Sequence, residues 1–386
     1  MSLYPMSEFI RLSAALNYQL PCVHDCSNNI LLLIIGNRRV PKTQRDILTR
    51  VIHYLARAYG EERRRLGPLA VLHPVRATAL LARSQPETNF LDLLTCLLHD
   101  KFEDITAGAV VQAGHDQKYF QELERQFEEM LGHVEPTDRW YLMERLEALT
   151  RHPDETYYTY IGKLMERAAS TPELVRVKLA DRLDNTLDLH LDVLDPLEEV
   201  DFYDMVFQVL FVHGFTVAAP AMEHPSTSVI NGAQRLYQLF KNAVLLSLIR
   251  RHKVTLSDTP TRTLFDGLAA AGMEEAQRII IHIFQYHYRD VEDQRELLMD
   301  TMGYCREEGI ARITPATRGH RLDGLFKDYF DFVGTDERRR KQTQLYADKP
   351  LMVEAALAFI VIFKSFLIDK DYFIEGVSAA GISDSQ

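Results

Sequence analysis

The dipeptide His-Asp occurs three times in the sequence, and only one copy has a context suited to chemistry. His99-Asp100 ends the leucine-rich run LLTCLLHD, whereas residues 24–25 lie in a polar segment expected to be irregular and residues 115–116 lie in a loop-like stretch. Polar side chains at the end of an apolar helix cost free energy unless they are paired or bind a metal. His99-Asp100 is therefore the pair to examine first.

The residues after this pair extend it to the pattern HDxxED, with Glu103 and Asp104 as the two acids. If residues 89–104 form one helix, Asp100 and Asp104 are one turn apart, as are His99 and Glu103. Two layers of metal-binding and acid/base groups are then expected to face one cavity.

Further metal ligands must come from other segments of the chain. His73 lies 26 residues upstream and opens a predicted helix with Pro74 at a favourable first-turn position. Asp181 lies in VKLADRLDNT, a predicted helix with one apolar side. Mixed histidine and carboxylate ligands suit Mn²⁺, Fe²⁺ or Zn²⁺. A bound divalent ion generates hydroxide from water near neutral pH, and a nearby carboxylate pair accepts the proton.

Taken together, HPVRATALLA, LLHDKFEDI and RVKLADRLDNT resemble the hydrolase domain of the RelA/SpoT group, over roughly residues 45–195. The resemblance implies an all-helical HD-domain fold and removal of the 3′-pyrophosphate from the alarmone (p)ppGpp, a reaction of the stringent response. It implies one Mn²⁺ bound by His73, His99, Asp100 and Asp181. It also implies that Glu103 and Asp104 act on the attacking water.

The resemblance assigns substrate contacts to Arg64, which matches a basic residue of the family, and to Asn185. Arg65 takes the place of a lysine, and arginine binds phosphate oxygens bidentately. The chain departs from the family at Leu66, Asp184 and Asp188, where the family has a serine, a histidine or similar residue, and a threonine. These positions are expected to hold the nucleotide, so the departures concern the substrate more than the metal chemistry.

Each of these residues also has a simpler interpretation. His99-Asp100 could only cap a helix, His73 could be an ordinary first-turn residue, and Asp181 could pair with Arg176 or Arg182. The acids of HDxxED and the arginines at 63–65 could be solvated surface groups. Cys22 and Cys26 flank His24 and Asp25 with metal-type residues, but the spacing is not that of a zinc knuckle.

The elements that must position these residues are nearly all helical in pattern, so the predicted class is all-α. We divide the chain into an N-terminal segment 1–42, an HD-type phosphohydrolase domain 43–198, and a helical C-terminal region 199–386 without a recognisable motif. The apolar helix at 352–366 is expected in a core or at a homo-oligomer interface. No match to the synthetase domain of long RelA/SpoT proteins is found after residue 199.

Composition limits the partners. The net charge of −11 disfavours a nucleic acid polymer and leaves a small phosphorylated nucleotide as the expected substrate. Four cysteines in 386 residues do not indicate a disulfide framework, and the start of the chain lacks the pattern of a secretory signal. The apolar runs are too short to cross a bilayer, so a cytoplasmic enzyme without a membrane partner is expected. The alternatives are an HD phosphohydrolase of another nucleotide or phosphoester, a nucleotide-responsive regulatory protein, or a structural helical protein.

Overall fold

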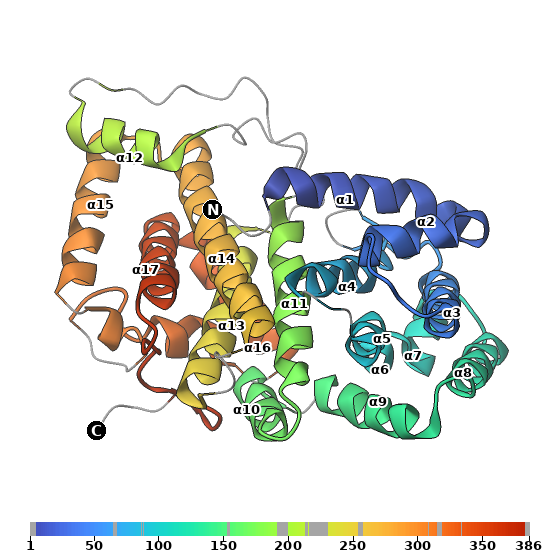
Figure 1. Cartoon of the computed structure of the whole chain (residues 1–386). Coiled ribbons are helices and arrows are strands. Elements are labelled where there is room, and N and C mark those ends of the chain that lie inside the picture. Colours follow the sequence, from blue (N-terminus) through green and yellow to red (C-terminus); the bar gives the residue numbers. More distant parts are fainter. Residues whose placement is uncertain are drawn as a thin grey trace. The chain divides into compact units, whose positions relative to one another are not determined.

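The computed structural model (Figure 1) describes residues 5–64, 68–85, 87, 89–152, 155–190, 200–212, 215, 231–253, 258–307, 309–314, 319–332 and 334–382. Within these residues almost all regular structure is helical, which confirms the all-α prediction. The described strands are two-residue segments, β1 (Val377–Ser378) and β2 (Gly381–Ile382), which pair antiparallel with Val377 opposite Ile382.

The chain forms two compact units. The first comprises Met1–Pro153, Lys163–Asp188 and Val254–Gly267, and the second comprises Asp154–Gly162, Leu189–Lys253 and Leu268–Gln386. Two long helices, α10 (Tyr157–Ala168) and α14 (Thr259–Tyr286), have residues in both. All residues predicted to do chemistry lie in the first unit.

The first unit holds the following further helices. They are α1 (Met6–Gln19), η1 (Leu20–Cys22), α2 (Val23–Ile35), α3 (Lys42–Tyr59), α4 (Leu72–Ser84), α5 (Phe90–Leu98), α6 (Lys101–Asp104), α7 (Ala107–Gln112), α8 (Gln117–Leu131), α9 (Pro136–Leu149) and α11 (Glu173–Leu187). Helices α1 and α2 pack on α4 in this unit, so the segment 1–42 contributes to the same core as the helices of the predicted HD domain.

Helix α4 is the centre of the first unit. It packs against α11, α5, α2 and α1, and of its residues only Arg83 is not buried. Alanines at 77, 79 and 82 leave little side-chain volume, so neighbouring helices can approach the α4 backbone closely. A helix covered on all sides cannot leave its polar side chains to water, so His73 and Arg76 must find partners inside the protein.

Two local predictions were wrong. The run 89–104 is not one helix, because Asp100 has backbone angles (φ −93°, ψ 4°) that end helical geometry between α5 and α6. Residues 24–25 are not irregular, because they lie in the first turn of α2. The run Ile30–Ile35, for which periodicity did not distinguish strand from helix, completes α2.

A buried carboxylate connects the helices around the site. Asp92 of α5 is fully buried and accepts hydrogen bonds from Arg145 of α9 (2.9 Å) and from Gln85 (3.1 Å). Arg176 of α11 approaches the same carboxylate at 3.4 Å and also donates to Asp258 at 2.9 Å. Because α5, α9 and α11 share this carboxylate, the helices that carry His99 and Asp181 have a fixed relative position.

The second unit contains α12 (Phe202–Phe211), α13 (Gly232–Arg251), α15 (Val291–Arg306), α16 (Thr335–Ala347) and α17 (Lys349–Ile368), with the short helices η3 (Gly309–Arg312) and η4 (Phe326–Phe330). The short helix η2 (Asp188–His190) begins in the first unit and ends in the second. Its core gathers aromatic rings such as Phe240, Phe326 and Phe359. Helix α17 is long and apolar enough to cross a membrane, but most of it is buried inside the unit. It thus resembles the core helix of a soluble protein.

Candidate metal centre

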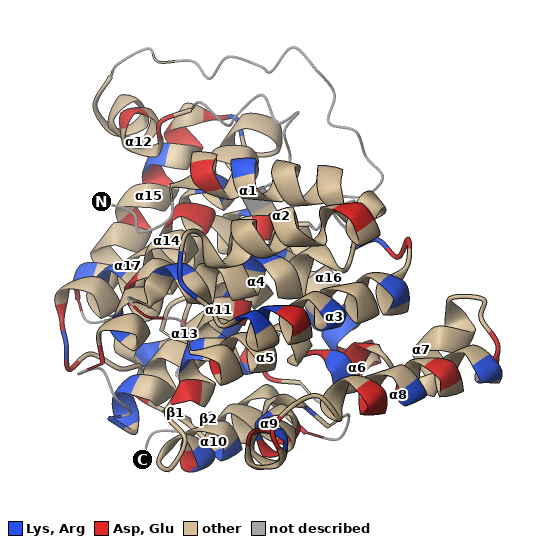
Figure 2. Ribbon diagram, turned by 45° about the vertical axis from the view of Figure 1, so that its right-hand side comes forward, with Lys and Arg blue, Asp and Glu red and all other residues tan. Residues whose placement is uncertain are grey.

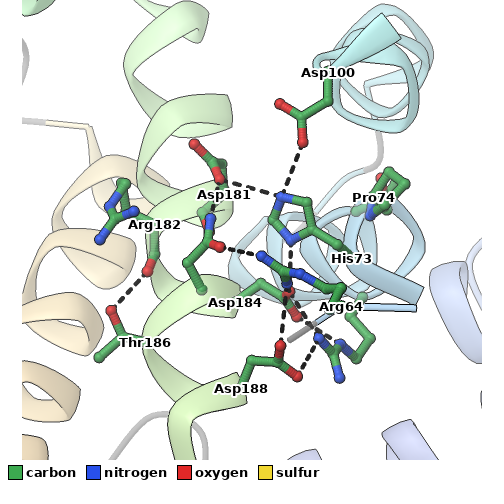
Figure 3. A network of polar contacts seen from close by, with 12 residues as sticks. Arg64, His73, Pro74, Asp100, Asp181, Arg182, Asp184, Thr186 and Asp188 are labelled. Atoms are coloured by element: carbon green, nitrogen blue, oxygen red, sulfur yellow. Dashed lines mark hydrogen bonds and ion pairs between the residues drawn. The ribbon is translucent and has the colours of Figure 1, made fainter. Parts of the chain in front are cut away.

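Three helical segments bring the predicted ligands together. His73 is the second residue of α4 and Asp181 lies in α11, and both point toward Asp100 (Figure 3). His99 and Asp100 form the turn between α5 and α6. His73, His99 and Asp181 are each at most 5% exposed, and these three residues form a group that can hold a metal ion. Asp100 joins them at the solvent side, with its side chain 21% exposed.

The distances between donor atoms are short. The Nε2 atoms of His73 and His99 are 3.2 Å apart, and each lies 3.2 Å from Oδ2 of Asp100. Oδ1 of Asp181 lies 3.3 Å from Nε2 of His73 and 3.8 Å from that of His99. Donor atoms bound to one ion at about 2.0–2.2 Å are separated by roughly 3–3.5 Å, so this spacing fits a shared cation.

In both histidines Nδ1 points away from the centre and Nε2 faces it, so Nδ1 is the outer nitrogen of each imidazole. Nδ1 of His99 lies 2.7 Å from the backbone carbonyl of Cys96, and Nδ1 of His73 lies 2.7 Å from Oδ2 of Asp184. Both outer nitrogens have acceptors only, so they carry the protons and donate them. In the neutral imidazoles the two Nε2 lone pairs then point at each other and at two carboxylates, an arrangement that requires a cation or added protons.

Asp184 belongs to the support of this centre. Its side chain is fully buried, and besides His73 it accepts two hydrogen bonds from Arg76, at 2.8 and 3.1 Å. Arg76 also pairs with Asp188 at 2.7 Å, and its guanidinium lies over the ring of Phe9. The family resemblance predicted that Asp184 and Asp188 lie where the nucleotide is held. In the structure both contact Arg76, and Asp184 orients the predicted metal ligand His73.

Asp181 is held by two neighbours on its own helix. Lys178 pairs with Oδ2 at 2.7 Å, and the amide of Asn185 donates to Oδ1 at 2.5 Å. The proposed partners Arg176 and Arg182 make no described ion pair with Asp181, and Arg176 is engaged with Asp92 and Asp258. Oδ1 of Asp181 therefore faces the histidines and is the oxygen available to a metal ion, whereas Oδ2 pairs with Lys178.

Arg64 lies beside this support, and its side chain is 26% exposed. It donates to Oδ1 of Asn185 at 2.5 Å and to Asp188 at 3.2 Å, and it lies 3.6 Å from Asp184 (Figure 3). The two predicted substrate contacts, Arg64 and Asn185, thus meet each other at the centre. Arg65 and Leu66 lie outside the described residues.

Glu103 and Asp104 are more exposed than the ligands, and each has one defined contact. Glu103 accepts a hydrogen bond from the backbone N–H of Arg151 at 2.7 Å. Asp104 accepts one from the hydroxyl of Tyr59 at 2.9 Å. Both side chains reach solvent, and the protein around them desolvates them only in part. This partial desolvation and the charge of Asp100 raise the pKa of Asp104 to about 6, and partial desolvation also raises the pKa of Glu103 although Lys178 opposes it.

The carboxylates around His73 and His99 raise the pKa of both imidazoles. Burial and the charge of Arg64 lower the pKa of His73, but hydrogen bonds with Asp100, Asp181 and Asp184 outweigh them and raise it to about 9. Burial likewise lowers the pKa of His99, yet Asp100 and Asp181 raise it well above its usual value. In the metal-free protein, protons therefore occupy the positions that a metal ion would take.

The residues that sequence reasoning missed are Arg76, Lys178 and Tyr59, and Asp184 was named there with another role. Helical spacing was the available signal for Arg76 and Lys178, since Arg76 follows His73 by three residues and Lys178 precedes Asp181 by three. Tyr59 had no such signal, because it meets Asp104 across 45 residues of sequence.

One other group of metal-type residues occurs in the described part of the chain, in the second unit: Asp300, His320 and Glu354. Nδ1 of His320 accepts a hydrogen bond from the backbone N–H of Leu322 at 3.1 Å. Its Nε2 must then carry the proton, which it donates to Asp300 at 3.0 Å. No lone pair of this imidazole is left for an ion. Cys22 and Cys26 belong to neither group.

Comparisons with protein-family models, with curated proteins and with solved structures found no match to this chain. The resemblance to the RelA/SpoT hydrolases therefore rests on the three motifs quoted above.

Replacing Asp184 with asparagine should weaken Mn²⁺ binding about 10- to 100-fold, because the supporting carboxylate of a histidine ligand orients the ring and strengthens its basicity. Calorimetric titration of the metal-free protein measures this. Asp188→Asn is the matched control, since it also removes a carboxylate from Arg76 but does not touch His73. Equal affinities of the Asp184→Asn variant and the wild type would refute the positioning role.

Metal binding should release protons at pH 7, because the pKa of His73 near 9 and the raised pKa of His99 keep both rings protonated in the metal-free protein. The apparent affinity for Mn²⁺ should then rise by about tenfold per pH unit for each proton released, and the rise should become shallower above about pH 9, where His73 is already deprotonated. Calorimetry in two buffers of different ionisation enthalpy counts the protons. An affinity independent of pH between 6 and 8 would contradict this.

Proposed function

We propose that the chain is a divalent-metal-dependent phosphohydrolase, with Mn²⁺ as the metal and the 3′-pyrophosphate of (p)ppGpp as the group removed. The observation that supports it is the convergence of two imidazole lone pairs and two carboxylates in a buried site, beside two acids of raised pKa. Structural groups seldom combine these features, because burying unpaired acceptors together is costly.

His73, His99, Asp100 and Asp181 would hold the ion. When bound, a divalent ion polarises a phosphoryl oxygen and lowers the pKa of water. Asp184, the Cys96 carbonyl and Lys178 fix the orientation of these side chains before any substrate arrives. This preorganisation reduces the reorganisation needed during the reaction.

Asp104 and Glu103 supply the proton acceptors. A carboxylate with a pKa of about 6 is mostly ionised at pH 7 and still binds a proton more readily than an ordinary aspartate. The Tyr59 hydroxyl holds one oxygen of Asp104, and the backbone of Arg151 holds one oxygen of Glu103. Each acid keeps its second oxygen for water or substrate.

Arg64 lies beside the centre with its side chain 26% exposed, and its guanidinium suits a phosphate group. Its guanidinium already contacts Asp188 and Asn185, so part of its charge is offset inside the protein. This favours a second candidate, a phosphohydrolase with the same metal chemistry that acts on another nucleotide or phosphoester. For a regulatory protein without turnover, the intact acid pair would have no use.

The test is hydrolysis of ppGpp by the purified chain with Mn²⁺ and with a chelator. Wild-type protein should release pyrophosphate only with metal. Asp100→Ala should lose both bound metal and activity, while Glu103→Ala should keep the metal and lose about 10²- to 10⁴-fold in rate, as expected for a proton-transfer group. Glu147→Ala, an exposed acid of α9, is the control and should behave as wild type.

The outcomes separate the candidates. Metal-dependent release of phosphate from a different nucleotide, with ppGpp unreactive, would favour the second candidate. Stoichiometric metal without hydrolysis of any nucleotide or phosphoester offered would refute the enzymatic proposal and leave a regulatory role.

A further inference from the structure

The first unit also contains a cavity whose lining shares no residue with the metal centre. It has a volume of about 730 Å³ and lies among η1, α2, α3, the segment after α3, and α8. Cavities of about 300–1,000 Å³ accommodate small organic ligands. Its size therefore suits a molecule as large as a nucleotide.

The rim of this cavity is basic, although the chain as a whole carries a net charge of −11. Three arginines line it, Arg50, Arg57 and Arg63, together with three histidines, His24, His53 and His133. The lining contains two acids, Glu61 and Glu129, and the second of these lies 3.3 Å from Arg125 outside the cavity. Figure 2 shows basic segments on α3, which supplies Arg50 and Arg57.

Arg50 and Arg57, the two arginines that α3 contributes to the cavity, keep most of their N–H groups available for a ligand. Arg57 has only a long contact with Glu122, at 3.8 Å, and lies over the ring of Tyr119. Arg50 makes no ion pair or side-chain hydrogen bond with the residues that the structure describes, and it is exposed. Two turns of helix separate them, so they face the same side. Arginine recognises phosphate oxygens through two parallel N–H groups.

The floor of the cavity contains polar atoms that lack partners. Nε2 of His53 and the hydroxyl of Tyr54 are buried and have no hydrogen bond in the described part of the chain. In the tautomer that carries its proton on Nδ1, His53 can accept a hydrogen bond from a ligand at Nε2. Burial and the neighbouring His24 lower the pKa of His53, so the ring stays neutral at pH 7. A buried polar atom without a partner destabilises the protein, and a ligand that bonds to it removes this cost.

The remaining floor is apolar, formed by side chains such as Leu20, Val71 and Met130. An apolar floor with a few polar atoms and a cationic rim matches a ligand with a flat organic part and a phosphate end. A simple anion would use the rim alone and leave the floor empty.

We propose that this cavity binds a phosphorylated small molecule of nucleotide size. Its phosphates contact Arg50 and Arg57, and its organic part donates a hydrogen bond to Nε2 of His53 and meets the hydroxyl of Tyr54. The site is separate from the metal centre and does not depend on the function proposed for that centre.

GDP, ADP and inorganic pyrophosphate are suitable probes, titrated into the full chain in the presence of a chelator so that the metal centre takes no part. We expect saturable binding of at least one nucleotide, with a dissociation constant of 1 mM or lower. Arg50→Glu should weaken it tenfold or more. Arg45→Glu is the matched control, because Arg45 is an exposed residue of the same helix outside the cavity.

Two further variants locate the bound molecule. His53→Phe should weaken nucleotide binding and leave pyrophosphate binding unchanged, whereas Asp100→Ala should change neither. Thermal unfolding of each variant without ligand verifies that it is folded. Absence of nucleotide binding up to 10 mM would overturn the proposal, as would binding that is lost in Asp100→Ala but kept in Arg50→Glu. Equal affinity for pyrophosphate and nucleotides would overturn the role of the floor.

Discussion

The constraint on which the first unit depends is the burial of several acceptors around one point. Nε2 of His73 lies 3.2–3.3 Å from Nε2 of His99, from Oδ2 of Asp100 and from Oδ1 of Asp181, and these side chains are largely shielded from water. Such a group repels itself unless positive charge is present. The protein meets this demand partly with Lys178 and otherwise with protons on the histidines, which a metal ion can replace.

The same constraint explains why α4 is so fully covered. Its small residues let α11 and α5 approach, and this brings Asp181 and His99 to His73. The second layer consists of Asp184 and Asp188 with Arg76 and Arg64, so its two negative charges are balanced by two positive ones and it fixes the imidazole of His73 without adding to the charge of the centre. Arg64 extends this layer toward solvent, and thus connects the buried charges to the place where an anionic substrate would arrive.

The helical class could be predicted from the sequence, because it depends on local patterns. His73, His99, Asp100 and Asp181 stood out by type and context, and the structure brings them together. The sequence did not predict the break between α5 and α6, since the backbone turn at Asp100 arises from packing and not from a glycine or proline. Asp184 was assigned to substrate, because nothing local shows that a carboxylate will meet a histidine 111 residues away.

Tyr59 and the basic cavity also depend on contacts between residues that are far apart in the sequence, which local patterns do not reveal. No motif in the sequence includes Arg50 or Arg57, and their significance comes from His53 and Tyr54, which line the same cavity, and from α8 beside them. Binding at the two sites is separable by mutation, since they share no residue.

The most direct measurement for the metal centre is anomalous diffraction from crystals of the full chain soaked with Mn²⁺, recorded on both sides of the manganese absorption edge. The account predicts one strong anomalous peak per chain, between the Nε2 atoms of His73 and His99 and the carboxylates of Asp100 and Asp181. A metal-soaked crystal without a peak there, or with the peak only at exposed acids, would contradict it.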